Sequence, residues 1–412
     1  MRECILLPLI FVSGIASSQP LCSQTSVGYP PINDLGAGTW NTFQGGLYPN
    51  GSNYIPAAHK NAGLQLASQI QPLDANGNPD AANGKIVFLS VGMSNCTQEF
   101  SAFMPLGNSD PGKNSKVVLV DGAQGGQTAQ IICSPYAGFW TTIDNRLQTN
   151  NVTAKQVQAI WYKEANQAGS LPPDQIYTDS LLSQSKRIMN IIKTRYPNAK
   201  ICYVASRIYG GYASSTLNPE PYAYLQGWVK KWLIDDQING DAMLQHSGAT
   251  PNSPWIAWGT YNWADGTTAR SDGLTWVCPI DFQNDGTHPS NAGAGKVAGR
   301  LLTFLDTDST ACWYRTGGCA SVTSSVSEQT SNAIHVFPNP ATGNIILRLS
   351  GINTFVHISI EDPLGKTVFR SDFDVSGNCD LRIDCKHLNA GLFFLKLNTN
   401  GALSTQKIII VG

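Results

Sequence analysis

Short apolar runs alternate with longer segments of helical periodicity between about residues 84 and 310, and this alternation constrains the fold more than any other feature. Each run is typical of a short strand that is buried on both faces. Strands that alternate with helices predict an α/β fold, here a five-stranded parallel sheet covered by helices. The expected strands are residues 86–91, 116–121, 157–162, 200–205 and 255–258. The expected helices are residues 61–71, 180–195, 222–238 and 292–305.

The chain that precedes this α/β segment differs from it in composition. Residues 1–18 combine a charged start, an apolar run and a stretch of small residues, which together predict a secretory signal peptide. Residues 19–83 are rich in Gly, Pro and Asn, and we interpret them as an N-terminal extension of unassigned role. No later stretch of the sequence approaches the roughly 18 apolar residues that a membrane-spanning helix needs.

The chain that follows the α/β segment changes character twice. Residues 311–333 begin with a short loop between two cysteines and continue as a stretch dense in Ser, Thr and Val, which predicts a linker. Residues 334–412 contain short runs separated by turn residues, which predict a small all-β sandwich. The expected strands there are residues 345–349, 356–361, 366–370, 380–383, 392–397 and 406–411.

The charge of the chain is low and balanced. Charged residues make up 13% of the sequence, and the formal net charge is −1. Because neither a basic patch nor a polyanion-binding run is present, we expect no nucleic-acid partner. The polarity comes from Asn, Gln, Ser, Thr and Gly instead, which fits an extracellular protein.

Ten cysteines indicate disulfides formed in an oxidising compartment. Cys312 with Cys319, and Cys379 with Cys385, are close in sequence, and we expect each pair to form a local disulfide. Cys96 is expected in a structural disulfide rather than as a second nucleophile, because no basic residue adjoins it in the sequence. The remaining pairings stay open. No cluster has the ligand spacing of a zinc site, so we expect no metal and no cofactor.

Polar residues that suit catalysis follow the expected strands. They are Ser94 after the first strand, Gly125 and Gly126 after the second, Asn166 after the third, and Asp285 and His288 before the last helix. All strands of a parallel sheet end at the same edge, where α/β proteins bind ligands. These residues are therefore expected to meet there, although they are distant in sequence.

The residue types suit nucleophilic catalysis. We interpret Ser94 as the nucleophile, His288 as the base that takes its proton, and Asp285 as the group that orients the imidazole. The backbone N–H groups of Ser94 and Gly125 and the side-chain amide of Asn166 are expected to form the oxyanion hole, with Gly126 as the alternative to Gly125. A structural interpretation also exists, because serine caps helices and asparagine or histidine closes turns.

Aromatic residues gather around the fifth expected strand. Trp255, Trp258, Tyr261 and Trp263 offer ring faces that stack on sugars, but core packing is the simpler interpretation of this cluster.

Residues 84–310 resemble the SGNH hydrolase family, also called GDSL esterases and lipases. Residues 92–95 (GMSN) are similar to its first block, with Met93 in place of the usual Asp; the sialate and carbohydrate acetylesterase branch has Gln there. Residues 122–128 (GAQGGQT) and 161–166 (WYKEAN) resemble the second and third blocks, the third being one residue shorter than in that branch. Residues 285–289 (DGTHP) resemble the last block. The resemblance implies a flavodoxin-like sheet and supports the site residues given above.

The end of the chain resembles a type IX secretion C-terminal sorting domain. The similarity rests on residues 336–341 (VFPNPA), 361–366 (EDPLGK), 388–393 (LNAGLF) and 407–411 (KIIIV). It implies export by an outer-membrane secretion machinery, and thus a secreted or cell-surface protein.

Together these features predict a secreted serine ester hydrolase that works through an acyl-enzyme. An ester-bearing compound is the expected substrate, with an acetylated polysaccharide or glycan as a candidate. Activity is then expected to fall as the pH drops through the ordinary imidazole pKa of about 6.5. The alternative is an inactive glycan-binding module on the same fold, which Met93 and the shortened third block favour.

Overall fold

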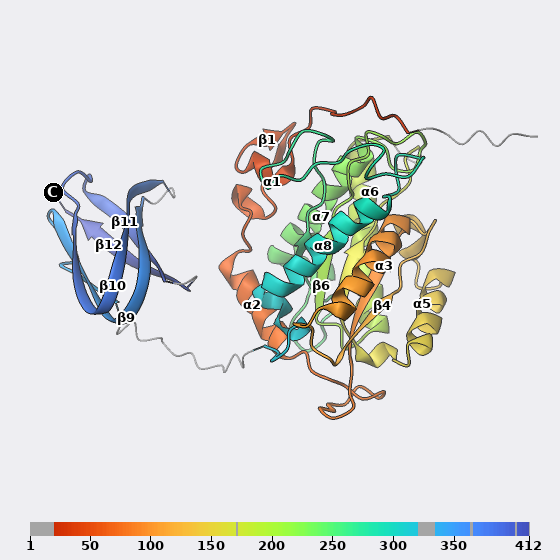
Figure 1. Ribbon diagram of the computed structural model, residues 1–412, viewed down its shortest axis with the longest axis horizontal. Helices are drawn as coiled ribbons and strands as arrows, with labels where there is room; N and C mark the ends of the chain where they lie inside the picture. Colours follow the sequence, from red (N-terminus) through yellow and green to blue (C-terminus); the bar gives the residue numbers. More distant parts are fainter. Residues whose placement is uncertain (1–19, 170–171, 320–333, 363–365, 400–401, 412) are drawn as a thin grey trace, which may run out of the picture. The chain divides into compact units, whose positions relative to one another are not determined.

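The computed structural model describes residues 20–169, 172–319, 334–362, 366–399 and 402–411 (Figure 1). The expected signal peptide lies outside these residues. The chain divides into two compact units, and the division falls between residues 322 and 323. No helix in the described ranges has both the length and the apolar character that a bilayer crossing requires.

A five-stranded parallel sheet forms the centre of the first unit, in the order β4-β3-β5-β6-β7. The strands are β3 (Ile86–Gly92), β4 (Val117–Asp121), β5 (Val157–Lys163), β6 (Ile201–Ala205) and β7 (Trp255–Thr260). All residues of β3, β5 and β6 are buried. This burial explains why the strands stand out in the sequence as apolar runs, and the expected α/β class with a five-stranded parallel sheet is confirmed.

Helices cover both faces of this sheet, with α3 and α8 side by side in front of it in Figure 1. The helices are α1 (Ile32–Leu35), α2 (Ala57–Ser68), α3 (Ser94–Ser109), α4 (Ala129–Ile132), α5 (Gly138–Thr149), α6 (Gln175–Arg195), α7 (Tyr222–Ile238) and α8 (Asn291–Thr307). Short 3₁₀ helices are η1 (Pro49–Gly51), η2 (Ala154–Gln156), η3 (Ala242–Leu244) and η4 (Ser309–Tyr314). The bounds of α7 agree with the sequence prediction. The helix α6 begins five residues before its expected start. The Asp174 side chain caps this end of α6 by accepting the N–H of Ile176.

The core of the first unit is rich in aromatic side chains. Phe88 of β3 packs edge-on against Phe100 and Phe103 of α3 and against Trp313 of η4. The aromatic cluster around β7 is buried as well, with exposures of 5% or less for Trp255, Trp258, Tyr261 and Trp263. Core packing is therefore the correct interpretation of that cluster, and its rings are not available as a sugar-stacking face.

Residues 20–83 pack onto the first unit. The Asp265 carboxylate accepts hydrogen bonds from the backbone N–H groups of Val27 and Gly28, and Ile32 is fully buried. A two-stranded ribbon, β1 (Thr39–Trp40) and β2 (Phe43–Gln44), lies in the same segment. A disulfide joins Cys22 to Cys278, a pairing that the sequence left open. The extension is thus held to the α/β unit by buried, polar and covalent contacts.

The second unit is an antiparallel β region in which hydrogen bonds join all five strands into one sheet, in the order β10-β9-β11-β12 with β8 beside β9. The strands are β8 (Ile334–Phe337), β9 (Asn344–Glu361), β10 (Thr367–Asp384), β11 (Gly391–Thr399) and β12 (Ala402–Ile410). Two pairs of expected short strands are each one long strand, because β9 and β10 pair continuously apart from two register shifts. The antiparallel β class is confirmed, and the arrangement of the strands as a sandwich stays a prediction.

The cysteine predictions are partly wrong. Cys312 and Cys319 form the expected disulfide. Cys379 and Cys385 are free thiols, because Cys379 lies in β10 and Cys385 directly follows it. Six residues of extended strand span about 20 Å, whereas a disulfide needs Cα atoms within about 7 Å. Cys96 is also free, since it is fully buried on α3 and has no cysteine partner among the described residues.

Candidate active site

Ser94 lies where β3 passes into α3, at the carboxyl edge of the sheet. It is the first residue of α3, and Met93 rather than Ser94 occupies the N-cap position. The turn brings the backbone of Gly92 so close to β5 that a Cβ atom there would lie 1.9 Å from the carbonyl oxygen of Lys163. Only glycine fits this position. The alternative interpretation of Ser94 as a helix cap is therefore wrong, and its hydroxyl is left to other partners.

His288 is the partner of Ser94. The imidazole Nε2 lies 2.8 Å from the Ser94 Oγ, and the Nδ1 forms a short hydrogen bond with Oδ2 of Asp285. The other carboxylate oxygen of Asp285 accepts the backbone N–H groups of Thr287 and His288, both at 3.0 Å. The structure thus brings together the three residues that the sequence predicted as nucleophile, base and orienting carboxylate.

The charge of Asp285 is stabilised by its surroundings. Partial burial acts to raise the pKa of this carboxyl, but hydrogen bonds from the side chain and backbone of His288 and from the N–H of Thr287 outweigh it and lower the pKa to about 2. Asp285 is therefore an anion at neutral pH. This carboxylate favours the tautomer of the neutral ring in which Nδ1 of His288 carries the proton, and in that tautomer Nε2 presents its lone pair to Ser94.

Asn166, an expected oxyanion-hole residue, lines the same cavity as Ser94. The Asn166 side-chain oxygen accepts the backbone N–H of Gln130 at 3.0 Å, and its nitrogen donates to Gln184 at 2.7 Å. These bonds fix the amide and leave one of its two N–H groups for a ligand. A Cβ atom on Gly125 would lie 3.8 Å from the Cβ of Ser94, so this backbone approaches the serine, while Gly126 lines the cavity.

A cavity of about 90 Å³ opens at this site. Its wall is formed by Met93, Ser94, Asn95, Gly126, Gln127, Thr128, Ala165, Asn166, Gln167, Arg207, Leu217, Asn218, Thr287 and His288. Met93 contributes to the wall and is 9% exposed, and Ser94 keeps its bond to His288 beside it. The methionine therefore changes the lining of the cavity without separating the serine from the histidine.

Comparison with known proteins identifies the second unit. Residues 335–411 match the family model of the secretion system C-terminal sorting domain. The chain ends in a type IX sorting domain. This sorting domain implies contact with the type IX secretion machinery and supports secretion or display at the cell surface.

Two solved structures resemble the chain weakly. No curated protein matches the chain. A candidate acylhydrolase of Bacteroides fragilis NCTC 9343 is 14% identical, with a TM-score of 0.31, over 62% of this chain and 99% of that one. An engineered protein is 11% identical, with a TM-score of 0.22, over 72% of this chain and 64% of that one. At these TM-scores neither likeness carries a conclusion about fold or activity.

Two charged residues beside the site escaped the sequence analysis. Lys163, at the end of β5, and Glu99, on α3, form an ion pair with distances of 2.6 Å, and both side chains are fully buried. Burial raises the pKa of Glu99 and lowers that of Lys163, while their attraction opposes both shifts. The pair joins the end of β5 to α3, the helix that begins with Ser94. Its sequence signal was weak, because a charged residue at a strand end reads as solvent-exposed.

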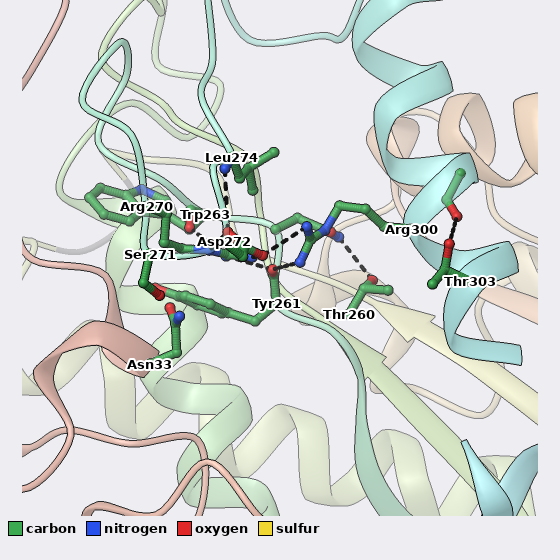
Figure 2. A network of polar contacts seen from close by, with 12 residues as sticks. Asn33, Thr260, Tyr261, Trp263, Arg270, Ser271, Asp272, Leu274, Arg300 and Thr303 are labelled. Carbon is green, nitrogen blue, oxygen red and sulfur yellow. Dashed lines mark hydrogen bonds and ion pairs between the residues drawn. The ribbon is translucent and has the colours of Figure 1, made fainter. Parts of the chain in front are cut away.

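A larger cavity, of about 670 Å³, lies between the end of β7, α8 and the N-terminal extension, and Figure 2 shows its polar network. Arg270 donates two hydrogen bonds to Asp272, at 2.8 and 2.6 Å, and Arg300 pairs with the same carboxylate at 3.0 Å. The N–H of Ser271 donates to Asp34 of the extension at 2.9 Å. The two arginines thus pair with Asp272, and the hydrogen bond between Ser271 and Asp34 ties the extension to this region. Because this cavity contains no paired nucleophile and base, the smaller one is the candidate active site.

Proposed function

We propose that the first unit is a serine ester hydrolase of the SGNH type. The observation that carries the proposal is the chain of contacts from Ser94 through His288 to Asp285. The sheet supports it: numbered along the chain, the parallel strands have the order 2-1-3-4-5, which is the flavodoxin-like order. In such sheets ligands bind where the strand order reverses, here between β3 and β5, and Ser94 and Asn166 follow these two strands.

The reaction would begin at the Ser94 hydroxyl. Its oxygen attacks the ester carbonyl carbon while His288 Nε2 takes the hydroxyl proton, and Asp285 stabilises the resulting imidazolium. The tetrahedral intermediate collapses as His288 gives this proton to the leaving alcohol, and the acyl group stays on Ser94. A water molecule, deprotonated by the same nitrogen, then attacks the acyl-enzyme, and His288 returns this proton to the Ser94 oxygen as the bond to the acyl carbon breaks and the acid leaves.

The negative charge on the carbonyl oxygen needs donors that are already oriented. The backbone N–H of Ser94, the free side-chain N–H of Asn166 and a backbone N–H from the glycine pair would supply them. Gly125 remains our choice for the last donor because its backbone approaches Ser94, and Gly126 remains the alternative because it lines the cavity.

The size of the cavity favours short acyl groups. Pockets that enclose drug-sized ligands have volumes of about 300–1,000 Å³, whereas the space beside Ser94 has about 90 Å³. An acetyl group is the smallest common acyl group and fits this space. Together with the sorting domain, this supports an exported enzyme that removes acetyl groups, with glycans as candidate substrates.

The test is covalent labelling of the full chain. The protein is exposed to an organophosphonate that carries a small alkyl group and then analysed by peptide mass spectrometry, with Ser94→Ala as the matched control. A single adduct on Ser94 that is absent in the variant is expected. A folded protein that gains no adduct would contradict the proposal and favour the inactive glycan-binding module instead.

A further inference from the structure

Arg207 lies in the wall of the catalytic cavity, just beyond the end of β6. The residue is 1% exposed, and it lines the same cavity as Ser94 and His288. Arginine is rarely buried to this degree unless a carboxylate or a set of carbonyl groups surrounds its guanidinium. The burial of Arg207 is therefore unusual, and the groups that contact its guanidinium determine its role.

The guanidinium has few partners. Among the described residues its side chain makes one hydrogen bond, from Nη2 to the carbonyl oxygen of Thr287 at 3.4 Å, and it forms no ion pair. Its Nε is buried and has no partner. The Thr287 carbonyl is shared, since Asn95 also donates to it at 3.1 Å. Arg207 thus reaches the cavity with most of its donors unused.

Four carboxyl groups interact electrostatically with Arg207: those of Glu99, Glu164, Glu220 and Asp285. Glu164 is fully buried, and its Oε1 accepts the N–H of Ala165 while its Oε2 has no hydrogen-bond partner among the described residues. Both oxygens of Glu99 accept hydrogen bonds from Lys163. Asp285 is bound to His288. Glu220 accepts the N–H groups of Gly210, Tyr224 and the Trp263 indole. None of these carboxylates lies within ion-pair distance of the guanidinium, and the cavity wall itself contains no acidic residue.

A buried guanidinium without a carboxylate in direct contact is unfavourable, because its N–H groups have lost their hydrogen bonds to water and no ion pair replaces them. A ligand that brings its own carboxylate removes this penalty and meets no like charge in the wall. The planar donors of arginine also match the two oxygens of a carboxylate. We propose that Arg207 binds a carboxylate of the substrate, close to the ester that Ser94 attacks. This proposal rests on the proposed esterase function.

This assignment narrows the substrate class to acidic esters. Because Arg207 and Ser94 line one cavity of about 90 Å³, the carboxylate stands only a few bonds from the scissile ester. Two sources have this chemistry. One is an O-acetyl ester of an acidic sugar, in which the alcohol part carries the carboxylate. The other is a hemiester such as a succinyl ester, in which the acyl part carries it.

The test compares matched pairs of substrates. One pair is an O-acetylated hexuronic acid and its uncharged methyl ester; the other is an aryl hemisuccinate and the aryl butyrate. The wild-type protein is expected to have a higher kcat/KM for the anionic member of one pair than for its uncharged counterpart. The pair that shows this preference tells whether the alcohol part or the acyl part of the substrate carries the carboxylate. Arg207→Met is expected to reduce this preference roughly 10- to 100-fold, the usual effect of losing hydrogen bonds to a charged group. Arg207→Lys, which keeps the charge without the planar fork, is expected to restore part of it.

Two outcomes would overturn the proposal. Equal loss of kcat/KM for both members of each pair in Arg207→Met would show that Arg207 only positions the loop of Thr287 and His288. Absence of any preference for the anionic member in the wild-type protein would show that no carboxylate is recognised.

A binding measurement separates this proposal from the esterase function. In Ser94→Ala, which cannot turn over ester, calorimetric titration with the acetylated hexuronic acid and with the hemisuccinate is expected to show binding of one of them, and no binding of its uncharged counterpart. This binding measurement tests the role of Arg207 even if the protein proves not to be an esterase, and it requires no folded Arg207 variant. Equal binding of charged and uncharged members, or binding of neither anion, would refute the role of Arg207.

Discussion

The Nε2 atom of His288 lies 2.8 Å from the Oγ of Ser94, although 194 positions separate the two residues in the chain. The contact exists because β3 ends beside the loop that precedes α8, and Asp285 fixes the imidazole from its other side.

Asp285→Asn is expected to lower kcat by roughly 10²- to 10⁴-fold, because an asparagine amide donates to Nδ1 and forces the imidazole into the wrong tautomer. The remaining oxygen can still accept the N–H groups of Thr287 and His288, so the loop is expected to keep its shape. Steady-state kinetics on aryl acetate measure the effect, and an unchanged melting temperature is the control. A variant with wild-type kcat would exclude Asp285 from the mechanism.

Asn166→Ala is expected to lower kcat by roughly 10²- to 10³-fold with a smaller change in KM, since an oxyanion donor acts mainly in the transition state. Gln184→Ala is the matched control. It removes the partner that holds the Asn166 amide at 2.7 Å but not the donor itself, and a smaller loss is expected. A larger effect in the control than in Asn166→Ala would contradict the oxyanion role.

Lys163→Met is expected to destabilise the fold by about 3–5 kcal/mol, because it leaves the fully buried Glu99 without its partner. The double variant Glu99→Leu/Lys163→Met is expected to recover most of this loss, since no charge then remains buried at that place. Urea unfolding of both variants measures the difference. If the double variant is less stable than the single one, the ion pair adds to the free energy of unfolding beyond the neutralisation of one buried charge by the other.

Glu220 predicts a pH dependence of stability. Burial raises the pKa of this carboxyl to about 7, against three hydrogen bonds and the charge of Arg207, which lower it. Between pH of about 4.5 and 7 the unfolded chain loses this proton while the folded protein keeps it, so the free energy of unfolding falls as the pH rises. The full contribution is on the order of 3 kcal/mol. Glu220→Gln is expected to flatten this part of the profile, whereas Asp179→Asn, at an exposed position, is expected to leave it unchanged.

The parallel sheet could be predicted from the sequence because β3, β5 and β6 are buried along their whole length and therefore consist mainly of apolar residues. The helix α7 was also placed correctly, since Leu225, Trp228 and Val229 repeat at helical spacing and are buried. The helix α3 was not bounded in advance, because Pro105 lies inside it and reads as a helix breaker. The second unit was divided into too many strands, since polar residues on its open faces interrupt the apolar pattern of β9 and β10.

The candidate site was predictable to the extent that chain order places residues on one edge of the sheet. Ser94, Asp285 and His288 follow that rule, and the structure brings them into contact. Arg207 follows the same rule, since it comes directly after β6, yet it escaped notice. A single arginine in a sequence is most often exposed, and its burial depends on segments from α3 and the loop before α8 that only the fold brings together.

The disulfide between Cys22 and Cys278 closes a covalent ring of the chain, with a sequence separation of 256. Ser94, Asn166 and Arg207 all lie inside this ring, while Asp285 and His288 stand just outside it. A protease that cuts any one loop within the ring therefore releases no fragment, and the two pieces remain tethered until the sulfur–sulfur bond is reduced. A protein exposed to proteases outside the cell can in this way be nicked once and still hold its catalytic parts together.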